Sequence, residues 1–344
     1  MSLVDAAERS TLGALLHTPD SVGEVTCWLQ PGDFLRPRNS IAFELIGGLA
    51  SASRLGPLEL LNAARDREEA RRNRVDGPFV HDLLRSPASV DRPAVYGRLV
   101  LEASVRRQVL RHGLRLDQID RASVVDGMAW TLAQVDRADE GLEDLSRRLR
   151  RAGLPDAGVV SALRQDRPQV GSDRCHRQEA AVLSALIARP SAIEEVALLL
   201  RPDDFRSPKH AATYASMQAL ADRSEPIEPL TVAWHASRRC RSLTLAELRA
   251  LASRPVLGTA RAACRALLEL RLGEGIAAAS TAMVHTSMRL DLSGSEVVAL
   301  SRTHLAELAG LRARLGAADR YTSTGGRSRA TAGQGESPAP ERSR

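Results

Sequence analysis

A chain of 344 residues, rich in alanine, leucine and arginine and with only 3% aromatic residues, is long enough for two helical domains of ordinary size. The net charge of +6 is weak evidence for nucleic-acid binding, because Lys209 is the only lysine and such usage reflects a GC-rich genome. No apolar run approaches the roughly 18 residues of a membrane span, and the first residues lack a signal-peptide pattern, so we expect a cytoplasmic protein with no membrane contact.

Short helices are expected at the start of the chain. Apolar residues recur at helical spacing from Val4 onward, and prolines stand where the next helices would begin, as at Pro19 and Pro37. Gly-Pro pairs at 56–57 and 77–78 mark further breaks. The six expected helices begin near residue 4, at Pro19 and at Pro37, and then cover 58–73, 79–86 and 92–104.

Two longer helices follow, and together they predict an antiparallel hairpin. The apolar pattern runs from Val105 to about Asp120 and from Ser123 to about Arg151, with a short connection between them. A hairpin alone cannot bury both of its faces, so it needs a partner surface. Residues 152–175, with glycine, proline and mixed charge, are expected to be a linker.

The second half of the chain repeats the first. The stretch "LQPGDFLRPRNSIAF" at 29–43 returns as "LRPDDFRSPKHAATY" at 200–214, and a shift of 171 residues aligns 8–50 with 179–221 without a gap. Of these 43 pairs, 14 are identical, and they are core and turn positions, which a duplicated fold retains. The second copy is then expected to form helices near 229–239, 244–252 and 258–268, and a hairpin of 269–288 and 293–316.

These patterns predict an all-α protein of two tandem six-helix globular modules, each followed by an antiparallel helical hairpin, with a disordered C-terminal tail. The tail prediction rests on its glycine, serine, proline and arginine content without apolar periodicity. The expected domains are module 1 (1–104), hairpin 1 (105–151), the linker (152–175), module 2 (176–268), hairpin 2 (269–318) and the tail (319–344).

The repeated turn supplies the candidate site residues that both copies share. In each copy an aspartate can accept hydrogen bonds from backbone amides, the next phenylalanine can anchor the core, and a proline can open the following helix. These residues are Asp33, Phe34 and Pro37 in the first copy, and Asp204, Phe205 and Pro208 in the second. A general acid or base role for either aspartate is the alternative, but capping explains the same pattern without catalysis.

No catalytic, cofactor-binding or metal-binding constellation stands out in the sequence. The four cysteines are scattered without a CxxC pair, and the eight histidines form no HExxH arrangement, so no metal is expected. A phosphate-binding loop needs a lysine after a glycine-rich turn, whereas Lys209 stands in "SPKHA" with no glycine near it. We therefore expect no ATP hydrolysis, no other enzymatic activity and no cofactor.

The repeated residues follow a definite order in both copies. An acidic residue precedes a leucine-rich helix, a proline, an apolar helix, a DF turn, a proline and a helix with an aromatic residue, in "ERSTLGALLHTPDSVGEV" (8–25) and "LQPGDFLRPRNSIAFELI" (29–46) and again in 179–196 and 200–217. This order, with the basic hairpin entry "LVLEASVRRQVL" (99–110), resembles the N-terminal domain of DnaB-type bacterial replicative DNA helicases. The resemblance implies modules that form a collar, pair through their hairpins and bind primase; the family's ATPase motor is not expected here.

The resemblance also implies candidate residues for hairpin pairing. Arg106 and Arg107 lie at the basic entry to hairpin 1, and Trp130 lies within that hairpin in "GMAWTLAQV". Tryptophan is frequent among the residues that dominate interface energies. Ordinary packing within the hairpin is the alternative role for Trp130.

Our leading hypothesis is a non-enzymatic adaptor or regulator linked to DNA replication, with the replicative helicase or primase as its partner. Its two hairpins could pair within the molecule, or the chain could form a homo-oligomer. The alternative is a DNA-binding regulator that uses the basic tail (320–344) and Arg-rich helices, including Arg147, Arg148, Arg150 and Arg151. A third possibility is a decayed duplicate with little function.

Overall fold

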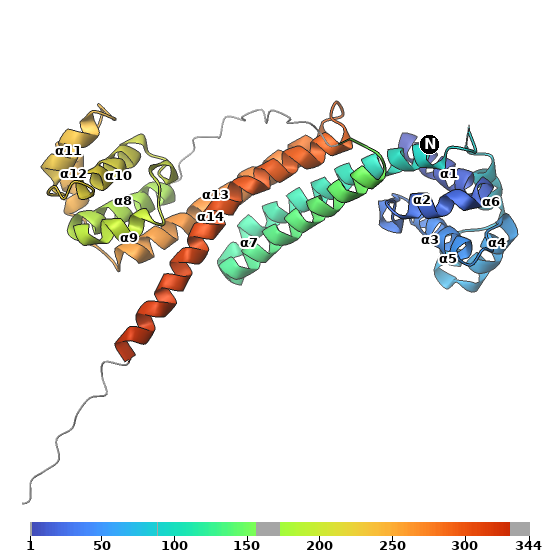
Figure 1. The fold of residues 1–344 in the computed structure, drawn as a ribbon, viewed down its shortest axis with the longest axis horizontal. Coiled ribbons are helices and arrows are strands. Elements are labelled where there is room, and N and C mark those ends of the chain that lie inside the picture. The colour runs from blue at the N-terminus through green and yellow to red at the C-terminus, as the bar shows by residue number, and fades with distance from the viewer. Residues whose placement is uncertain (1, 88, 156–172, 331–344) are drawn as a thin grey trace, which may run out of the picture. The chain divides into compact units, whose positions relative to one another are not determined.

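The computed structural model describes residues 2–87, 89–155 and 173–330, with the backbone only for 119–126 and 319–330. Every regular element in these ranges is helical, as Figure 1 shows, so the all-α prediction is confirmed. The chain divides into two compact units. Unit 1 contains Met1–Leu163 and Ala277–Leu305, and unit 2 contains Arg164–Ile276 and Ala306–Arg344.

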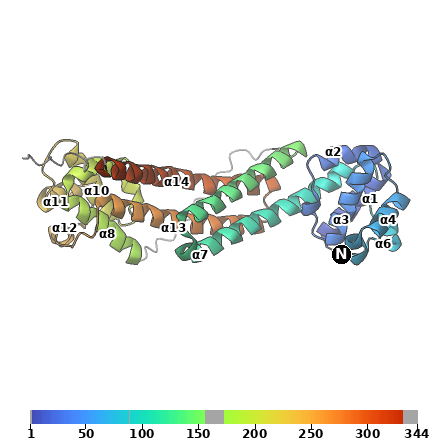
Figure 2. The ribbon, with the colours of Figure 1, turned by 90° about the horizontal axis from the view of Figure 1, so that it is seen from below.

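Module 1, in unit 1, is a group of short helices around α1 (Leu3–His17), visible in Figures 1 and 2. The other helices are α2 (Val22–Thr26), α3 (Pro37–Ser51), α4 (Pro57–Asp66), α5 (Glu68–Arg72) and α6 (Gly77–Leu84), with 3₁₀ turns at Pro19–Ser21 and Pro31–Asp33. Side chains cap two of the helix starts: Ser2 accepts from the Asp5 amide, and Asp76 accepts from the Phe79 amide. The buried face of α1 packs on α3 and α6.

Two boundaries of module 1 differ from the sequence pattern. The expected helix over 58–73 is divided at Arg67, which takes an extended conformation (φ −103°, ψ 113°) and pairs with Glu44 at 2.9 Å. The expected helix over 92–104 is not separate, because α7 (Pro93–Arg151) continues from the module into hairpin 1. Module 1 and its hairpin are therefore joined by continuous helix.

Hairpin 1 is α7 folded back on itself at Gly127. This glycine has φ 77° and ψ 164°, a region that residues with a side chain rarely adopt, so the turn lies later than the connection expected from the sequence. The arms are antiparallel, since Nε of Arg98 donates to the carbonyl oxygen of Ala152 at 2.6 Å. A Cβ on Gly141 would lie only 2.6 Å from His112, so this glycine allows a close approach of the arms.

Module 2, in unit 2, repeats the element order of module 1, except that no described helix corresponds to α5. Its helices are α8 (Asp173–Ala188), α9 (Ile193–Ala197), α10 (Pro208–Ala221), α11 (Pro229–Ser237) and α12 (Leu245–Ala252), with 3₁₀ turns at Pro190–Ala192 and Pro202–Asp204. Helix α12 begins with a capping box, in which Thr244 and Glu247 each bond the other's backbone amide. The helices expected near 229–239 and 244–252 correspond to α11 and α12.

Hairpin 2 consists of α13 (Ala260–Met288) and α14 (Gly294–Ala330), and each of these helices contributes to both units. Helix α13 joins the expected helix over 258–268 to the expected first arm. Helix α14 extends to Ala330, past the expected end of the hairpin at residue 318. Residues 156–172 of the expected linker and 331–344 of the expected tail lie outside the described residues.

The duplication is visible in the aromatic packing of both modules. The ring of Phe34 lies 4.9 Å from the ring of Phe43, and the ring of Phe205 lies 5.0 Å from that of Tyr214, with similar tilts of 36° and 33°. In each case the phenylalanine of the repeated turn packs on the helix that follows it. The two copies therefore share a core as well as a sequence pattern.

A buried glutamate fastens the repeated turn to the first helix of each module. In module 1, Glu8 accepts hydrogen bonds from the Leu35 amide, from the Arg36 amide (3.4 Å) and from Nδ2 of Asn39 (2.7 Å). Its side chain is fully buried, so these donors replace the water that the carboxylate has lost.

Glu179 has the corresponding position and role in module 2. It accepts from the amides of Arg206 (2.5 Å) and Ser207 (3.3 Å) and pairs with Nδ1 of His210 (2.7 Å). Burial alone would raise the pKa of Glu179, but the bonds from His210 and the Arg206 amide outweigh it and lower that pKa. Burial and the nearby Glu179 raise the pKa of Cys175 to about 12, so its thiol stays neutral and donates to Glu179 at 3.4 Å.

Replacing Glu179 with glutamine should lower the free energy of unfolding of module 2 at neutral pH by about 2 kcal/mol, because hydrogen bonds to a buried charged acceptor are strong. The folded-state pKa of Glu179 lies below its ordinary value of 4.5. Its contribution is therefore fully present above that value and is lost as the pH falls through the folded-state pKa. Urea denaturation followed by circular dichroism in a pH series measures the difference.

The matched control is Glu194→Gln, because Glu194 is an exposed glutamate on α9 of the same module. The gap between wild type and Glu179→Gln should be constant near neutral pH and should shrink in acid. An equal loss in the control, or a gap that does not change in acid, would contradict this role of Glu179.

Candidate functional site

The aspartate of the repeated turn is almost fully buried in module 1, where Asp33 is 1% exposed. Its carboxylate caps the turn by accepting from the Gln30 amide at 2.7 Å. It also accepts from Oγ of Ser104 at 2.6 Å and forms an ion pair with Arg148. Ser104 and Arg148 stand on the two arms of α7, so one carboxylate binds both arms of the hairpin.

Arg148 is almost as deeply buried as its partner, with 3% of its surface exposed. Its Nε donates to the carbonyl oxygen of Trp28 at 2.9 Å, which leaves the rest of the guanidinium for Asp33. Arg107, on the first arm, donates to the backbone carbonyl of Asp33. Burial lowers the pKa of Arg107, while the carboxylates of Glu8 and Asp33 act in the opposite direction.

Module 2 has an equivalent ion pair. Asp204 accepts from the Arg201 amide at 2.7 Å and pairs with Arg314 of α14, whose Nη2 lies 2.9 Å from Oδ1. Arg314 also donates to the carbonyl oxygen of Leu199 at 3.2 Å. Both hairpins are therefore fastened to the DF turn of their own module by an arginine.

Sequence reasoning singled out the turn residues but missed their arginine partners. Arg148 lies in "RRLRR" (147–151), where a solvated cationic helix end was the obvious interpretation. A signal was present, because the buried residues Leu142, Leu145 and Leu149 mark the apolar face and Arg148 falls on it. An arginine on the buried face of a helix needs a carboxylate partner nearby.

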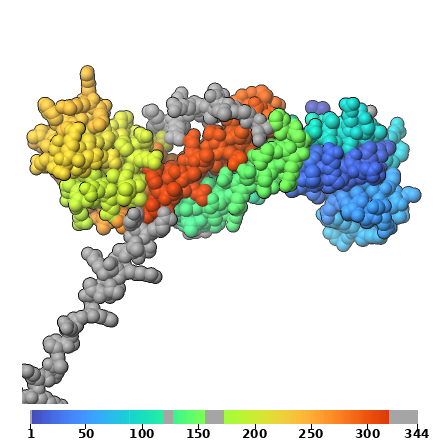
Figure 3. All heavy atoms as spheres, in the orientation of Figure 1, coloured from blue at the N-terminus to red at the C-terminus, as the bar shows by residue number. Residues whose placement is uncertain are grey.

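A second contact surface lies between α7 and residues 277–305, within unit 1. Oγ of the buried Ser280 donates to the carbonyl oxygen of Gly113 at 2.9 Å. A Cβ on Gly113 would lie 3.0 Å from Val284, so glycine at this position permits the close approach of the helices. Figure 3 shows the two stretches in direct contact along this surface.

The predicted hairpin-pairing residues take three different positions. Arg106 donates to the carbonyl oxygens of Arg289 and Leu292, which connect α13 to α14. Arg107 contacts the repeated turn instead, and Trp130 lies close to the Gly127 turn with 38% of its surface exposed. The contact between the hairpins also includes an ion pair of Arg302 with Glu143 at 2.6 Å, which sequence reasoning did not propose.

Neither a metal-ligand cluster nor a membrane-spanning helix occurs among the described residues. Among them, no three histidine, cysteine, aspartate or glutamate side chains come together as metal ligands. Within the same ranges, no helix combines the length and the apolar character that crossing a membrane requires.

Comparison with known families explains the duplicated architecture. A family model described as the DnaB-like helicase N-terminal domain matches residues 4–102 and 174–259, which together are more than half of the chain. The chain belongs to this family. The two matched stretches coincide with the two modules, so the tandem copies of a DnaB-like N-terminal domain are confirmed.

Known DnaB proteins resemble part of the chain. The replicative DNA helicase DnaB of Mycobacterium leprae is 28% identical over 141 residues, which are 41% of this chain and 23% of the relative. The chain thus matches less than a quarter of that relative's length. The crystal structure of the N-terminal domain of DnaB helicase from Mycobacterium tuberculosis is 26% identical and covers 40% of this chain and 95% of that one, with a TM-score of 0.36.

Replacing Arg148 with methionine should destabilise the first DnaB-like module by about 3 kcal/mol, because Asp33 would be left buried without its charge partner. Trp28 is buried next to Arg148 and reports on this module. With Trp130 and Trp234 replaced by phenylalanine, its fluorescence in a urea series measures the change.

Arg147→Met is the matched control, because Arg147 is about half exposed and pairs only at the surface with Asp144, at 3.2 Å. Such pairs contribute about 0.5 kcal/mol. Equal effects of the two substitutions would refute a special role for the buried pair.

Proposed function

We propose that this chain is a non-enzymatic adaptor or regulator linked to DNA replication, which binds the replicative helicase or primase of its host. The observation that carries the proposal is the presence of two DnaB-like modules in one chain, with residues of hairpin 2 packed on hairpin 1. The relative in M. leprae is a replicative DNA helicase, which supports the link to replication. As a partner of such proteins, the chain would act in the cytoplasm.

The pairing of the hairpins explains how one chain could bind a helicase or primase. The resemblance implies that DnaB-type modules pair through hairpins of separate subunits. Here both hairpins belong to one chain, and covalent connection raises the effective concentration of one for the other. A single chain would therefore present the surfaces that two helicase subunits present together, and a helicase or primase could bind to them.

The absence of enzymatic activity is part of the proposal. The chain's only lysine, Lys209, forms an ion pair with Glu247 at 2.6 Å, an arrangement unlike that of a lysine in a phosphate-binding loop. Both stretches matched by the family model belong to the N-terminal domain of the helicase. These observations favour a role in binding other proteins over a role in catalysis.

The DNA-binding alternative loses one of its four candidate arginines in the structure. Arg148 is buried against Asp33, and Arg147 pairs with Asp144 at 3.2 Å. Arg150 lies 3.8 Å from Glu143. Arg148 is thus withdrawn from phosphate contact, whereas Arg147 and Arg150 are about half exposed and their surface pairs are weak. The pull-down described below therefore decides between the two functions.

The wild-type chain should sediment as a monomer, because each hairpin covers the surface through which the other would pair with a second chain. Gly113→Arg should separate them, since there is no room for a side chain between α7 and Val284. The variant should show faster amide hydrogen exchange in 277–305 and form concentration-dependent dimers in analytical ultracentrifugation. Gly310→Arg, at an exposed helical glycine with open space around it, is the matched control.

A stable hexamer of the wild-type chain would refute intramolecular pairing. So would a Gly113→Arg chain with unchanged exchange in 277–305.

The purified chain should capture the host's replicative helicase or primase in a pull-down that survives moderate salt. Contacts that bury apolar surface resist salt, whereas phosphate contacts weaken steeply as the salt concentration rises. Gly113→Arg should reduce capture and Gly310→Arg should not. Capture of DNA alone, with neither protein retained, would overturn the proposed function in favour of a DNA-binding regulator.

A further inference from the structure

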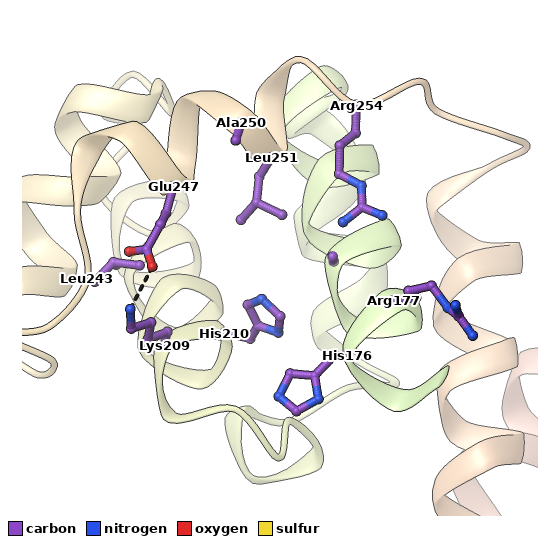
Figure 4. Close-up of a pocket in the computed structure, with 10 residues that line it drawn as sticks. His176, Arg177, Lys209, His210, Leu243, Glu247, Ala250, Leu251 and Arg254 are labelled. Atoms are coloured by element: carbon purple, nitrogen blue, oxygen red, sulfur yellow. Dashed lines mark hydrogen bonds and ion pairs between the residues drawn. The ribbon is translucent and has the colours of Figure 1, made fainter. Parts of the chain in front are cut away.

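Module 2 contains a cavity of about 510 Å³ between α8, α10 and α12. Figure 4 shows Glu247, Leu251 and Arg254 on one side of it and His176, Lys209 and His210 on the other. A cavity of this volume lies in the range of ordinary ligand sites. All of its lining residues belong to unit 2.

The corresponding region of module 1 is occupied by different side chains, and the internal repeat shows which. The shift of 171 residues aligns Arg9 with Ala180, and in module 1 Arg9 forms an ion pair with Asp82 of α6 at 3.0 Å. Helices α6 and α12 align through their N-caps, Asp76 and Thr244, each of which binds the amide three residues later. This alignment places Ala250 of module 2 opposite Asp82 of module 1, so alanines replace both members of the ion pair.

An aromatic side chain is missing from module 2 at the same place. Phe79 of module 1 is buried, and the guanidinium of Arg38 lies 4.4 Å from the centre of its ring. By the same alignments, Glu247 replaces Phe79 and Lys209 replaces Arg38. A bulky apolar side chain and an ion pair have thus been exchanged for small residues and a Lys-Glu pair.

The floor of the cavity is apolar. Leu243, Leu251 and Ala180 line it, and each of them is at least nine-tenths buried. No tryptophan, tyrosine or phenylalanine lines it, so it has no platform for a stacked base. The floor suits an aliphatic or aromatic side chain inserted from a partner, in the place that Phe79 fills in module 1.

The rim of the cavity is cationic. Among the described residues, neither Arg177 nor Arg254 has a carboxylate partner. Lys209 is neutralised by Glu247, and Nδ1 of His210 is held by Glu179, which leaves Nε2 as its remaining polar atom. His176 lies beside it, with the two ring centres 6.1 Å apart. Two guanidinium groups and two imidazoles therefore surround an apolar floor.

We propose that this cavity is a docking site for an acidic peptide segment that inserts one large apolar side chain between its carboxylates. The charges of Arg177 and Arg254 complement the carboxylates, and the floor takes the apolar side chain. The inference rests on the proposed adaptor function, because such a segment belongs to a protein partner. Module 1, with its place filled by Phe79 and the Arg9–Asp82 pair, does not bind such a segment.

The test is fluorescence anisotropy of the full chain with a short fluorescein-labelled peptide of aspartates and glutamates around one phenylalanine. The wild-type chain should bind it saturably. Arg254→Glu should weaken binding about tenfold, as reversal of a rim charge does in other complexes. Ala250→Asp should weaken it similarly, because it restores the acid that module 1 carries. Both positions are exposed, so neither substitution should disturb folding, which circular dichroism verifies.

Matched controls separate this site from general charge attraction. Arg238→Glu changes an exposed arginine at the end of α11 that does not line the cavity, and it should leave binding unchanged. Peptides with serine in place of the acids, or with alanine in place of the phenylalanine, should bind at least tenfold more weakly. No saturable binding, an equal loss with Arg238→Glu, or displacement by a single-stranded oligonucleotide would each overturn the proposal.

A second measurement distinguishes this inference from the proposed function. If the peptide fails to bind while the chain still captures helicase or primase, the cavity proposal alone is overturned. If the peptide binds as described while neither protein is captured, the proposed function alone is overturned.

Discussion

The buried ion pair between Asp33 and Arg148 is the constraint on which the arrangement of module 1 and its hairpin depends. Two charges are tolerated in a protein interior only when each is paired and hydrogen-bonded. The carboxylate also accepts from Ser104 and from the Gln30 amide, so the turn and both arms of α7 meet at one group. Any other orientation of the hairpin would leave a charge unpaired, and the hairpin is therefore held in one orientation relative to its module.

In module 2 an ion pair also joins the turn to the hairpin, but its two residues have a different spacing along the chain. Asp33 and Arg148 are 115 residues apart, whereas Asp204 and Arg314 are 110 apart. The arginine is thus displaced by several residues in the repeat while the contact with the turn aspartate is kept. A contact retained despite a changed spacing points to the attachment of the hairpin as the property that both copies need. Glu8 and Glu179, which bond the backbone just after the same turns, have the same role in the two modules.

The sequence predicts the features that depend on local chemistry. Pro37 and Pro208 fix helix starts, and both turns lie where the repeated DF dipeptide places them. The division of the helix over 58–73 was not predictable, because Arg67 breaks it without any glycine or proline. The partners of Asp33 and Asp204 were also missed, since spacing along the chain contains no information about which distant arginine returns to a turn. The position of the hairpin turn at Gly127 could have been read from its glycine.

The cavity of module 2 illustrates what a duplication permits. In module 1 the Arg9–Asp82 pair joins α1 to α6 and Phe79 of α6 is buried, and these contacts help to hold α6 in place. In module 2 the equivalent helix, α12, buries Leu248 and Leu251 and is joined to α10 by the Lys209–Glu247 pair, so it is attached without the Arg9–Asp82 pair. A copy whose helix is attached by other contacts can have small residues here, and the cavity of module 2 lies beside them. The two modules therefore share a core and differ in the residues around this opening. This difference is the basis for different binding by the two modules.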